Sequence, residues 1–555
     1  MSVIKEEKVV NNNDNKALIA GGLTSSLGIF ISKMLGVVYV IPFNRLIGET
    51  ASVFYSYAYT YYDYLLTLSI AGLPFAISLV VARYYTKEDY KTVLSVRKIA
   101  RNLLLALGFV SFLILTLFAG PIAQQISGTS DAEYITSVKT VLYIISLALL
   151  VVPVLSSIRG FYQGQKEFVA SAVSEVIEQV TRVGFLLTSI YLCVLVFDQG
   201  RIVAVYWAVG SAVFAALCSL AYLTVFDNRH KKELLKQAEI QKEAAVDKKT
   251  IIRELVICCL PFLLASLIGE ANGIINTTFF DKAMLARGEA KEFVDIIYSI
   301  LNTWANKLTS IPQVLAIGFG VAIIPVMTEL LVKKDYSGLR RQINDGFNTA
   351  SFIALPLVFC LMYFSTAVYA TMYGYGNYLT GGEGLRWACL LAITGSVFPL
   401  ASSIMMAIRL RRKYILSLFV GFVSKLATTY FFIYRFGYPG AMITSALSAL
   451  VIFLLNLYFI AKTYQVSYGS FLSNLGKMLI GVAGMYGAAK LLNICGLSFH
   501  YQSQLKDLIT LAVYGIVTVA VYLVISWSLK LPQQIFDIDG ETLLRKLRRG
   551  KHEKT

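Results

Sequence analysis

The strongest constraint in this sequence of 555 residues is the recurrence of apolar stretches about as long as a bilayer is thick. A helix needs roughly 20 mostly apolar residues to cross the hydrocarbon, because lipid cannot pair with unsatisfied backbone N–H and C=O groups. Hydrophobic residues make up 57% of the chain and charged residues only 15%, too few to cover one water-soluble core of this size. The chain is therefore predicted to be an all-α polytopic membrane protein.

Apolar runs separated by charged residues, Gly or Pro predict about fourteen transmembrane helices. These runs lie at 17–41, 51–82, 102–122, 137–158, 168–197, 202–226, 254–280, 296–331, 347–374, 385–408, 414–434, 439–461, 472–493 and 506–529. The predicted parts are a cytoplasmic tail (1–16), a six-helix bundle (17–226), a charged cytoplasmic linker (227–253), a second six-helix bundle (254–463), helices 13 and 14 (464–530) and a basic cytoplasmic tail (531–555). The first 16 residues are polar, so we expect no cleavable signal peptide.

The charges of the loops predict the orientation of these helices. With the N-terminus placed in the cytoplasm, 35 of the 50 Lys and Arg residues fall in cytoplasmic segments and 10 in external loops. This asymmetry predicts that both termini are cytoplasmic. The net charge of +17 is then a topology signal with some attraction to anionic lipid, and it does not require a nucleic acid partner.

Two short motifs recur at a common offset of 246 residues and predict an internal repeat. Lys87-x-Asp89-Tyr90 matches Lys333-x-Asp335-Tyr336, and Pro153-x-x-Ser156-Ser157-Ile158 matches Pro399-x-x-Ser402-Ser403-Ile404. The offset corresponds to six helices, and an even number preserves orientation across the membrane. We therefore expect two parallel six-helix bundles around a central cavity, an architecture typical of alternating-access transporters. The alternative is that both motifs reflect common features of helix ends and helix packing.

Metal and cofactor chemistry is not expected. The seven cysteines lack the CxxC spacing of metal sites, and His230, His500 and His552 fall in predicted loops or near the C-terminus. The sequence contains no G-x-x-x-x-G-K-[ST] phosphate loop, so ATP is not expected to be the direct energy source. The chain is predicted to be a transporter without a cofactor and not an enzyme.

Charged and amide side chains within the predicted helices are the candidate site residues, because a charge at bilayer depth costs a few kcal/mol unless it faces a cavity or a partner. The substrate-binding candidates are Lys33, Arg182, Glu270, Asn272, Asn306 and Lys307, and the candidates for ion coupling or a polar network are Asp63, Glu175 and Glu178. Lys33 and Lys307 have no opposite charge within four residues, so they suit an anionic ligand such as phosphate or pyrophosphate. The alternative for each residue is a snorkelling side chain or a structural ion pair, which we favour for Lys425 and leave open for Asp63.

Helical spacing and helix breaks add three further expectations. Spacings of three and four place Glu175, Glu178 and Arg182 on one helix face, where the acids can hold the arginine or carry a coupling proton or cation. Gly72-Leu73-Pro74 and Ile311-Pro312 are predicted to interrupt or loosen their helices. An interfacial aromatic belt accounts for some of the tyrosines between 55 and 62, and sugar stacking is the alternative.

Three features carry a resemblance to a known family: Ser32-Lys33-x-Leu35-Gly36, Ala305-Asn306-Lys307-x-x-x-Ile311-Pro312 followed by Gly318-x-Gly320-x-x-Ile323-Ile324-Pro325, and the grouping of helices as six, six and two. Together they resemble the MurJ-like lipid II flippases of the multidrug/oligosaccharidyl-lipid/polysaccharide (MOP) exporter superfamily, in the Gram-positive branch with the YtgP and SpoVB-like proteins. The resemblance implies a cationic central cavity for the pyrophosphate and sugar-peptide head of the lipid, and a groove on helices 13 and 14 for its polyprenyl tail.

In this resemblance Lys33 and Lys307 occupy the positions of cavity arginines in Gram-negative members. Two positions depart from the family pattern, since Tyr39 replaces a basic residue and Ser310 replaces an acid. Glu270, Glu175 and Arg182 are the residues expected to compensate.

The expected function is that of a bacterial plasma-membrane flippase that moves undecaprenyl-pyrophosphate-linked peptidoglycan precursor (lipid II) to the outer leaflet by alternating access. Its expected partners are the polyprenyl-pyrophosphate-linked saccharide, membrane lipids and cell-wall synthesis proteins. The alternatives are a flippase for capsular or other polysaccharide units, a cation-coupled multidrug exporter and a structural scaffold. A membrane glycosyltransferase is disfavoured because the first external loop offers only Glu49 beside Arg45, without an acidic pair.

Overall fold

The computed structural model describes residues 36, 39–70, 72–127, 131–165, 167–241, 244–313, 327, 330–331 and 333–536, and this part of the chain contains helices and no strand. Ten helices in it are long and apolar enough to cross a membrane. The prediction of an all-α polytopic membrane protein is thus confirmed, while the number fourteen stays a prediction. The chain divides into two compact units, 1–278 and 279–555, which are described separately.

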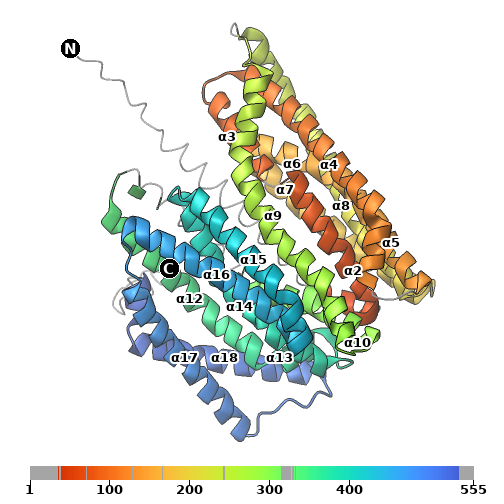
Figure 1. Ribbon diagram of the computed structural model, residues 1–555, viewed down its shortest axis with the longest axis vertical. Helices are drawn as coiled ribbons and strands as arrows, with labels where there is room; N and C mark the ends of the chain where they lie inside the picture. The colour runs from red at the N-terminus through yellow and green to blue at the C-terminus, as the bar shows by residue number, and fades with distance from the viewer. Residues whose placement is uncertain are drawn as a thin grey trace, which may run out of the picture. The chain divides into compact units, whose positions relative to one another are not determined.

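The first unit is built from long helices joined by short turns (Figure 1). They are α2 (Val40–Ile70), α3 (Leu73–Tyr85), α4 (Tyr90–Ser127), α5 (Ala132–Ser146), α6 (Ala148–Gly164), α7 (Phe168–Tyr191) with the π-helix η1 (Leu192–Val196), α8 (Arg201–Ile240) and most of α9 (Lys248–Ala286). Helix α6 packs against α3, α4 and α8, and α7 packs along α8 and α2. The middle of this unit therefore lies between α2, α6, α7 and α8.

The predicted break in the second apolar segment is present between α2 and α3. Gly72 has a φ of 73°, a left-handed conformation that glycine adopts at little cost, and a proline lies in the first turn of α3. Past the break, α3 lies close to α6. A Cβ added to Gly160 would stand 2.6 Å from the carbonyl oxygen of Pro74, so only glycine allows this approach.

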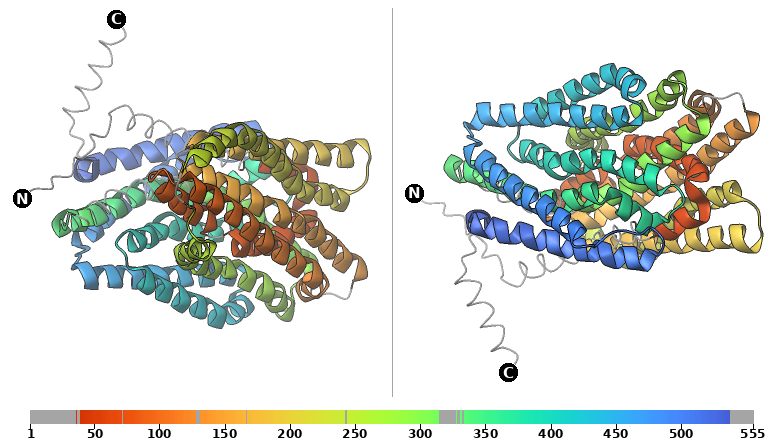
Figure 2. Two further views of the ribbon diagram at one scale, coloured as in Figure 1. Left: turned by 90° about the horizontal axis from the view of Figure 1, so that it is seen from above. Right: turned by 90° about the horizontal axis from the view of Figure 1, so that it is seen from below.

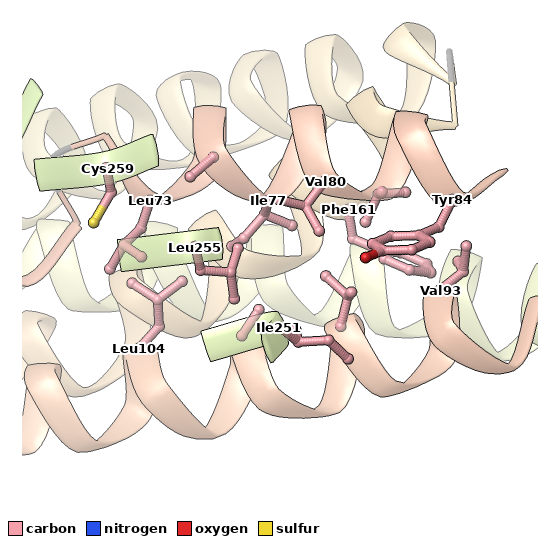
Figure 3. Packing of buried hydrophobic residues seen from close by; sticks show 14 of the residues in the cluster. Leu73, Ile77, Val80, Tyr84, Val93, Leu104, Phe161, Ile251, Leu255 and Cys259 are labelled. Atoms are coloured by element: carbon pink, nitrogen blue, oxygen red, sulfur yellow. The ribbon is translucent and has the colours of Figure 1, made fainter. Parts of the chain in front are cut away.

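The core of the first unit joins α3, α4, α6 and α9, and α8 contributes Leu234 (Figure 3). Ile77 of α3, Leu104 of α4 and Phe161 of α6 pack with Ile251 and Leu255 of α9, and each of these side chains is at most 1% exposed. The start of α9 belongs to the predicted cytoplasmic linker, and α8 itself continues to Ile240. The linker is thus largely helical, and part of it is docked on the first unit by apolar burial.

The turn before α4 and the turn before α12 (Tyr336–Tyr363) have the same local structure, as expected for matching positions of the predicted 246-residue repeat, and the repeat itself stays a prediction. Glu88 and Lys334 have left-handed φ values of 60° and 57°. Asp89 then accepts a hydrogen bond from the backbone N–H of Thr92 at 3.1 Å, and Asp335 accepts one from that of Gly338 at 2.9 Å. Each aspartate is an N-cap that satisfies a free backbone donor of its helix.

The two N-cap aspartates differ in their contacts with other parts of the chain. Gln241 of the linker donates to Asp89 at 2.8 Å and accepts from the backbone N–H of Lys91 at 2.9 Å. Burial acts to raise the pKa of Asp89, but the hydrogen bonds from Thr92 and Gln241 outweigh it and hold that pKa below its ordinary value. The pKa of Asp335 is also lowered, chiefly by the hydrogen bond from the backbone of Gly338.

We therefore expect Asp89→Ala to destabilise the protein more than Asp335→Ala, because only Asp89 also anchors the linker. The expected cost at Asp89 is about 1–2 kcal/mol, a lost cap plus one hydrogen bond. Because folding lowers the pKa of Asp89, its contribution is complete at neutral pH and disappears as the pH falls below 3.8 through the lowered pKa. Denaturant unfolding of both variants in detergent measures this, and equal losses of stability would contradict it.

The described helices of the second unit form two outer pairs around a central layer (Figure 2). They are α10 (Lys291–Ser299) with the π-helix η2 (Ile300–Trp304), α12 (Tyr336–Tyr363), α13 (Ser365–Tyr373), α14 (Tyr378–Ala407), α15 (Arg411–Phe436), α16 (Tyr438–Tyr464), α17 (Gly469–Ile494), α18 (Gln504–Ser528) and α19 (Leu531–Phe536). The α15–α16 pair packs on α14, and the α17–α18 pair packs on α12 and α13. The two last long helices thus form a layer of their own against the second unit.

Lys425 of α15 fits neither of the two roles predicted for it, a snorkelling side chain or a member of a structural ion pair. It is 2% exposed, so it does not snorkel, and its Nζ donates to Oγ of Ser445 on α16 at 3.0 Å. Within the described segments it forms no ion pair. The helices approach closely here, because Ser448 of α16 donates to the backbone carbonyl of Gly421 at 2.8 Å, and this packing encloses the lysine.

Candidate functional site

A partly buried group of three charges joins α6 and α7 in the first unit. Glu178 accepts from Arg182, one turn along α7, at 2.8 Å and from Arg159 of α6 at 2.9 Å. The side chains of Glu178, Arg159 and Arg182 are 15%, 15% and 21% exposed. The predicted pairing of Glu178 with Arg182 is thus confirmed. One carboxylate is shared by two guanidinium groups, so this group carries an excess positive charge.

Arg159 is a member of the group that sequence reasoning did not identify. Its Nε donates to Oγ of Ser174 at 2.7 Å, and its Nη2 donates to Oγ of Ser219 at 3.1 Å. Ser219 in turn donates to the backbone carbonyl of Ser174 at 2.8 Å. The arginine therefore ties α6 to both α7 and α8. The only signal for it in the sequence is a basic residue three positions after Ser156, at the end of the repeated motif.

Tyrosines of α2 surround the free side of Arg182. Tyr55 and Tyr59 have ring centroids 4.4 Å apart, and Tyr59 and Tyr62 have centroids 5.9 Å apart. Both Tyr59 and Tyr62 lie close enough to Arg182 to interact with its charge. Tyr55 and Tyr62 are only 6% and 4% exposed, so an interfacial aromatic belt does not explain them. The tyrosines form one wall of the charged group.

The arrangement leaves hydrogen-bonding capacity on the arginine. The Nε of Arg182 is buried and, among the residues that the structure describes, has no hydrogen-bond partner. A guanidinium with a spare buried donor beside tyrosine hydroxyls suits an anion, and phosphate oxygens fit it well. Glu175 is half-buried one turn before Glu178 on α7, and Asp63 is exposed on α2 within electrostatic range of Tyr59 and Tyr62.

In the second unit, Asn306 and Lys307 lie directly after a π-helical turn. The five residues of η2 end at Trp304, whose backbone carbonyl accepts from the hydroxyl of Tyr373 at 3.0 Å. Asn306 is exposed and Lys307 is half-buried, and Oγ of Ser310 donates to the carbonyl of Lys307 at 2.6 Å. Single π-turns inside helices are frequent at functional sites, because they turn the following side chains out of the regular helical register.

Three predicted site residues receive no structural test. Lys33 lies outside the described residues, as do Gly318 and Gly320. Glu270 and Asn272 lie in helix α9, and their side chains are not described. Their roles therefore stay predictions.

This chain is similar in sequence to several known proteins. Residues 18–331 match the family of polysaccharide biosynthesis proteins. The chain is 32% identical to "Lipid II flippase MurJ" of Bacillus subtilis (strain 168) over 542 residues, covering 96% of this chain and 99% of that protein. It is 25% identical to "Stage V sporulation protein B" of the same organism over 361 residues, covering 64% of this chain and 65% of that protein.

Solved structures confirm the fold. A structure of "Lipid II flippase MurJ, inward closed conformation" superposes with a TM-score of 0.65 at 16% identity, covering 92% of this chain and 99% of that one. An inward-facing multidrug resistance MATE family transporter of the MOP superfamily superposes with a TM-score of 0.60 at 15% identity, covering 79% and 96%. The fold is thus that of the MOP superfamily. Since both the family match and the nearly full-length similarity agree, the chain belongs to the polysaccharide biosynthesis protein family and, within it, to the family of the lipid II flippase MurJ.

Proposed function

We propose that this protein is a flippase that moves lipid II, the undecaprenyl-pyrophosphate-linked peptidoglycan precursor, from the inner to the outer leaflet. The observation that carries the proposal is the 32% identity to a lipid II flippase over 96% of this chain and 99% of that protein. The family consists of transporters and not of catalysts, so no bond is made or broken.

The proposed mechanism is alternating access of two parallel six-helix bundles, with two further helices for the lipid tail and both termini in the cytoplasm. Lys33, Arg182 and Lys307 would neutralise the pyrophosphate in a cavity of low dielectric constant, where such contacts are stronger than in water. Asn306, Glu270 and Asn272 would contact the head group. Glu175, Glu178 and Asp63 would hold the arginine and take part in coupling to an ion gradient or the membrane potential. Cell-wall synthesis proteins are further proposed partners.

The test is complementation of a bacterial strain depleted of its lipid II flippase, with lipid II exposure at the outer surface as the readout. We expect the wild-type protein to restore exposure, and Lys33→Gln and Lys307→Gln to reduce it at least tenfold, because each removes a charge that would bind pyrophosphate. Lys282→Gln, which neutralises an exposed lysine of α9, is the matched control and should keep full activity. A wild-type protein that is inserted in the membrane and leaves lipid II unexposed would overturn the proposal.

A second candidate function is a flippase for another lipid-linked polysaccharide unit, and the match of residues 18–331 to the family of polysaccharide biosynthesis proteins favours it over a drug exporter. Depletion of this protein in its own host separates the two. Normal lipid II exposure together with loss of a surface polysaccharide would support the second function. Loss of lipid II exposure would support the first.

A further inference from the structure

A cavity of about 470 Å³ lies in the second unit. Its walls come from the α12–α13 junction, from α14, from the C-terminal end of α17, from the loop that follows it and from α18. Five of its lining residues are aromatic, and its polar side chains include Asn493 and Ser498. This volume lies within the range of small-ligand sites.

Arg386 of α14 is the one charged residue among the described residues that line this cavity. It is exposed, and within the described part of the chain it forms no ion pair and no hydrogen bond. It lies eight residues into α14, about 12 Å from the start of that helix. An exposed arginine that lines an aromatic cavity without an acidic partner has a full set of donors for an anionic ligand.

Hydrogen bonds and a ring contact fix the segments around the cavity. The carboxylate of Asp507, at the start of α18, accepts from the backbone N–H of His500 at 3.0 Å and from the hydroxyl of Tyr375 at 2.8 Å. Tyr514 donates to the backbone carbonyl of Leu497 at 2.6 Å, and its ring stacks on that of Phe499 with centroids 5.4 Å apart. These contacts join the α17–α18 loop to α18 and, through Asp507, to the segment between α13 and α14. The cavity is therefore formed without a ligand.

The surface beside the cavity is typical of contact with lipid. Leu491 and Ile494 at the end of α17 are 63% and 80% exposed, and Leu505 at the start of α18 is 68% exposed. In a membrane protein such aliphatic side chains face acyl chains or the interfacial region. A ligand that reaches Arg386 along these helices would therefore combine an anionic group with an apolar body.

We propose that this cavity binds the phosphate of an anionic lipid headgroup, with Arg386 as its ion-pair partner and Asn493 and Ser498 as further hydrogen-bonding groups. The aromatic rings contact the glycerol and the first carbons of the chains. This lipid is a resident of the second unit, distinct from the transported molecule. The proposal concerns a different unit from the buried arginines, so it can fail without affecting the proposed function.

The test uses the full-length protein in nanodiscs of phosphatidylglycerol diluted in diacylglycerol and phosphatidylcholine, with retained lipid counted by native mass spectrometry. We expect Arg386→Gln to lower phosphatidylglycerol retention about tenfold and Arg386→Lys to lower it less. Ser498→Trp, which fills the cavity and keeps the charge, should also lower retention. Arg435→Gln at the end of α15, outside the cavity, is the matched control and should retain the lipid.

Three outcomes would overturn the proposal. One is equal phosphatidylglycerol retention by Arg386→Gln and the wild-type protein, with both shown to be folded by their unfolding temperatures. Another is displacement of the lipid by millimolar soluble glycerol phosphate, which would mean that the site takes a free phosphate ester and not a lipid. Retention of diacylglycerol as strong as that of phosphatidylglycerol would likewise show that phosphate is not recognised.

Discussion

Glu178→Ala is expected to abolish translocation and to lower the free energy of unfolding by about 3 kcal/mol, because it leaves two partly buried guanidinium groups without their shared carboxylate. The loss is larger than for an exposed ion pair, since Arg159 and Arg182 are only 15% and 21% exposed. Thermal and denaturant unfolding in detergent and lipid II exposure in a depleted strain are the two measurements. Unchanged stability would show that the three charges do not act as a group.

A matched control and a charge-free variant separate stability from transport. Glu167→Ala removes an exposed carboxylate at the start of α7 that makes no capping hydrogen bond, so it should have little effect on either readout. Replacing Arg159, Glu178 and Arg182 together by methionine should restore much of the stability, because an apolar set of similar volume avoids burying unpaired charge. Transport should stay lost if Arg182 contacts the anionic substrate. Restored transport would assign the group a purely structural role.

Gly160→Val is expected to cost about 3 kcal/mol or more, because its Cβ would stand 2.6 Å from a backbone oxygen of Pro74 and 2.8 Å from the Cα of the same residue. Backbone cannot move aside as a flexible side chain can, so α3 would have to shift at its break with α2. Flippase activity should fall together with stability, because the break between α2 and α3 lies in a segment that is proposed to move during transport.

The control for this variant is Gly184→Val in α7 of the same unit. No heavy atom lies within 4 Å of a Cβ added there, so the substitution changes helix propensity without a clash. Its unfolding temperature should stay close to that of the wild-type protein. Similar losses in the two variants would mean that the approach of α3 to α6 is not the cause.

The sequence was most informative where the physics is local. Length and hydropathy determined an all-α membrane protein, because lipid requires each crossing segment to satisfy its own backbone. The break at Gly72 and the pairing of Glu178 with Arg182 also depend only on residues within a few positions of one another. Each of these features follows from backbone conformation or helical spacing.

The tertiary structure decided the features that join distant segments. Arg159 entered the charged group because α6 packs beside α7, which places it against a carboxylate 19 residues further along the chain. The inward orientation of Tyr55 and Tyr62, the enclosure of Lys425 and the cavity around Arg386 likewise depend on which helix faces bury each other. In a chain that is apolar on nearly every helix face, hydropathy does not distinguish the lipid side from the protein side. The sequence by itself therefore determined an all-α membrane protein and the local pair of Glu178 and Arg182, and only packing decided which polar side chains from different helices meet.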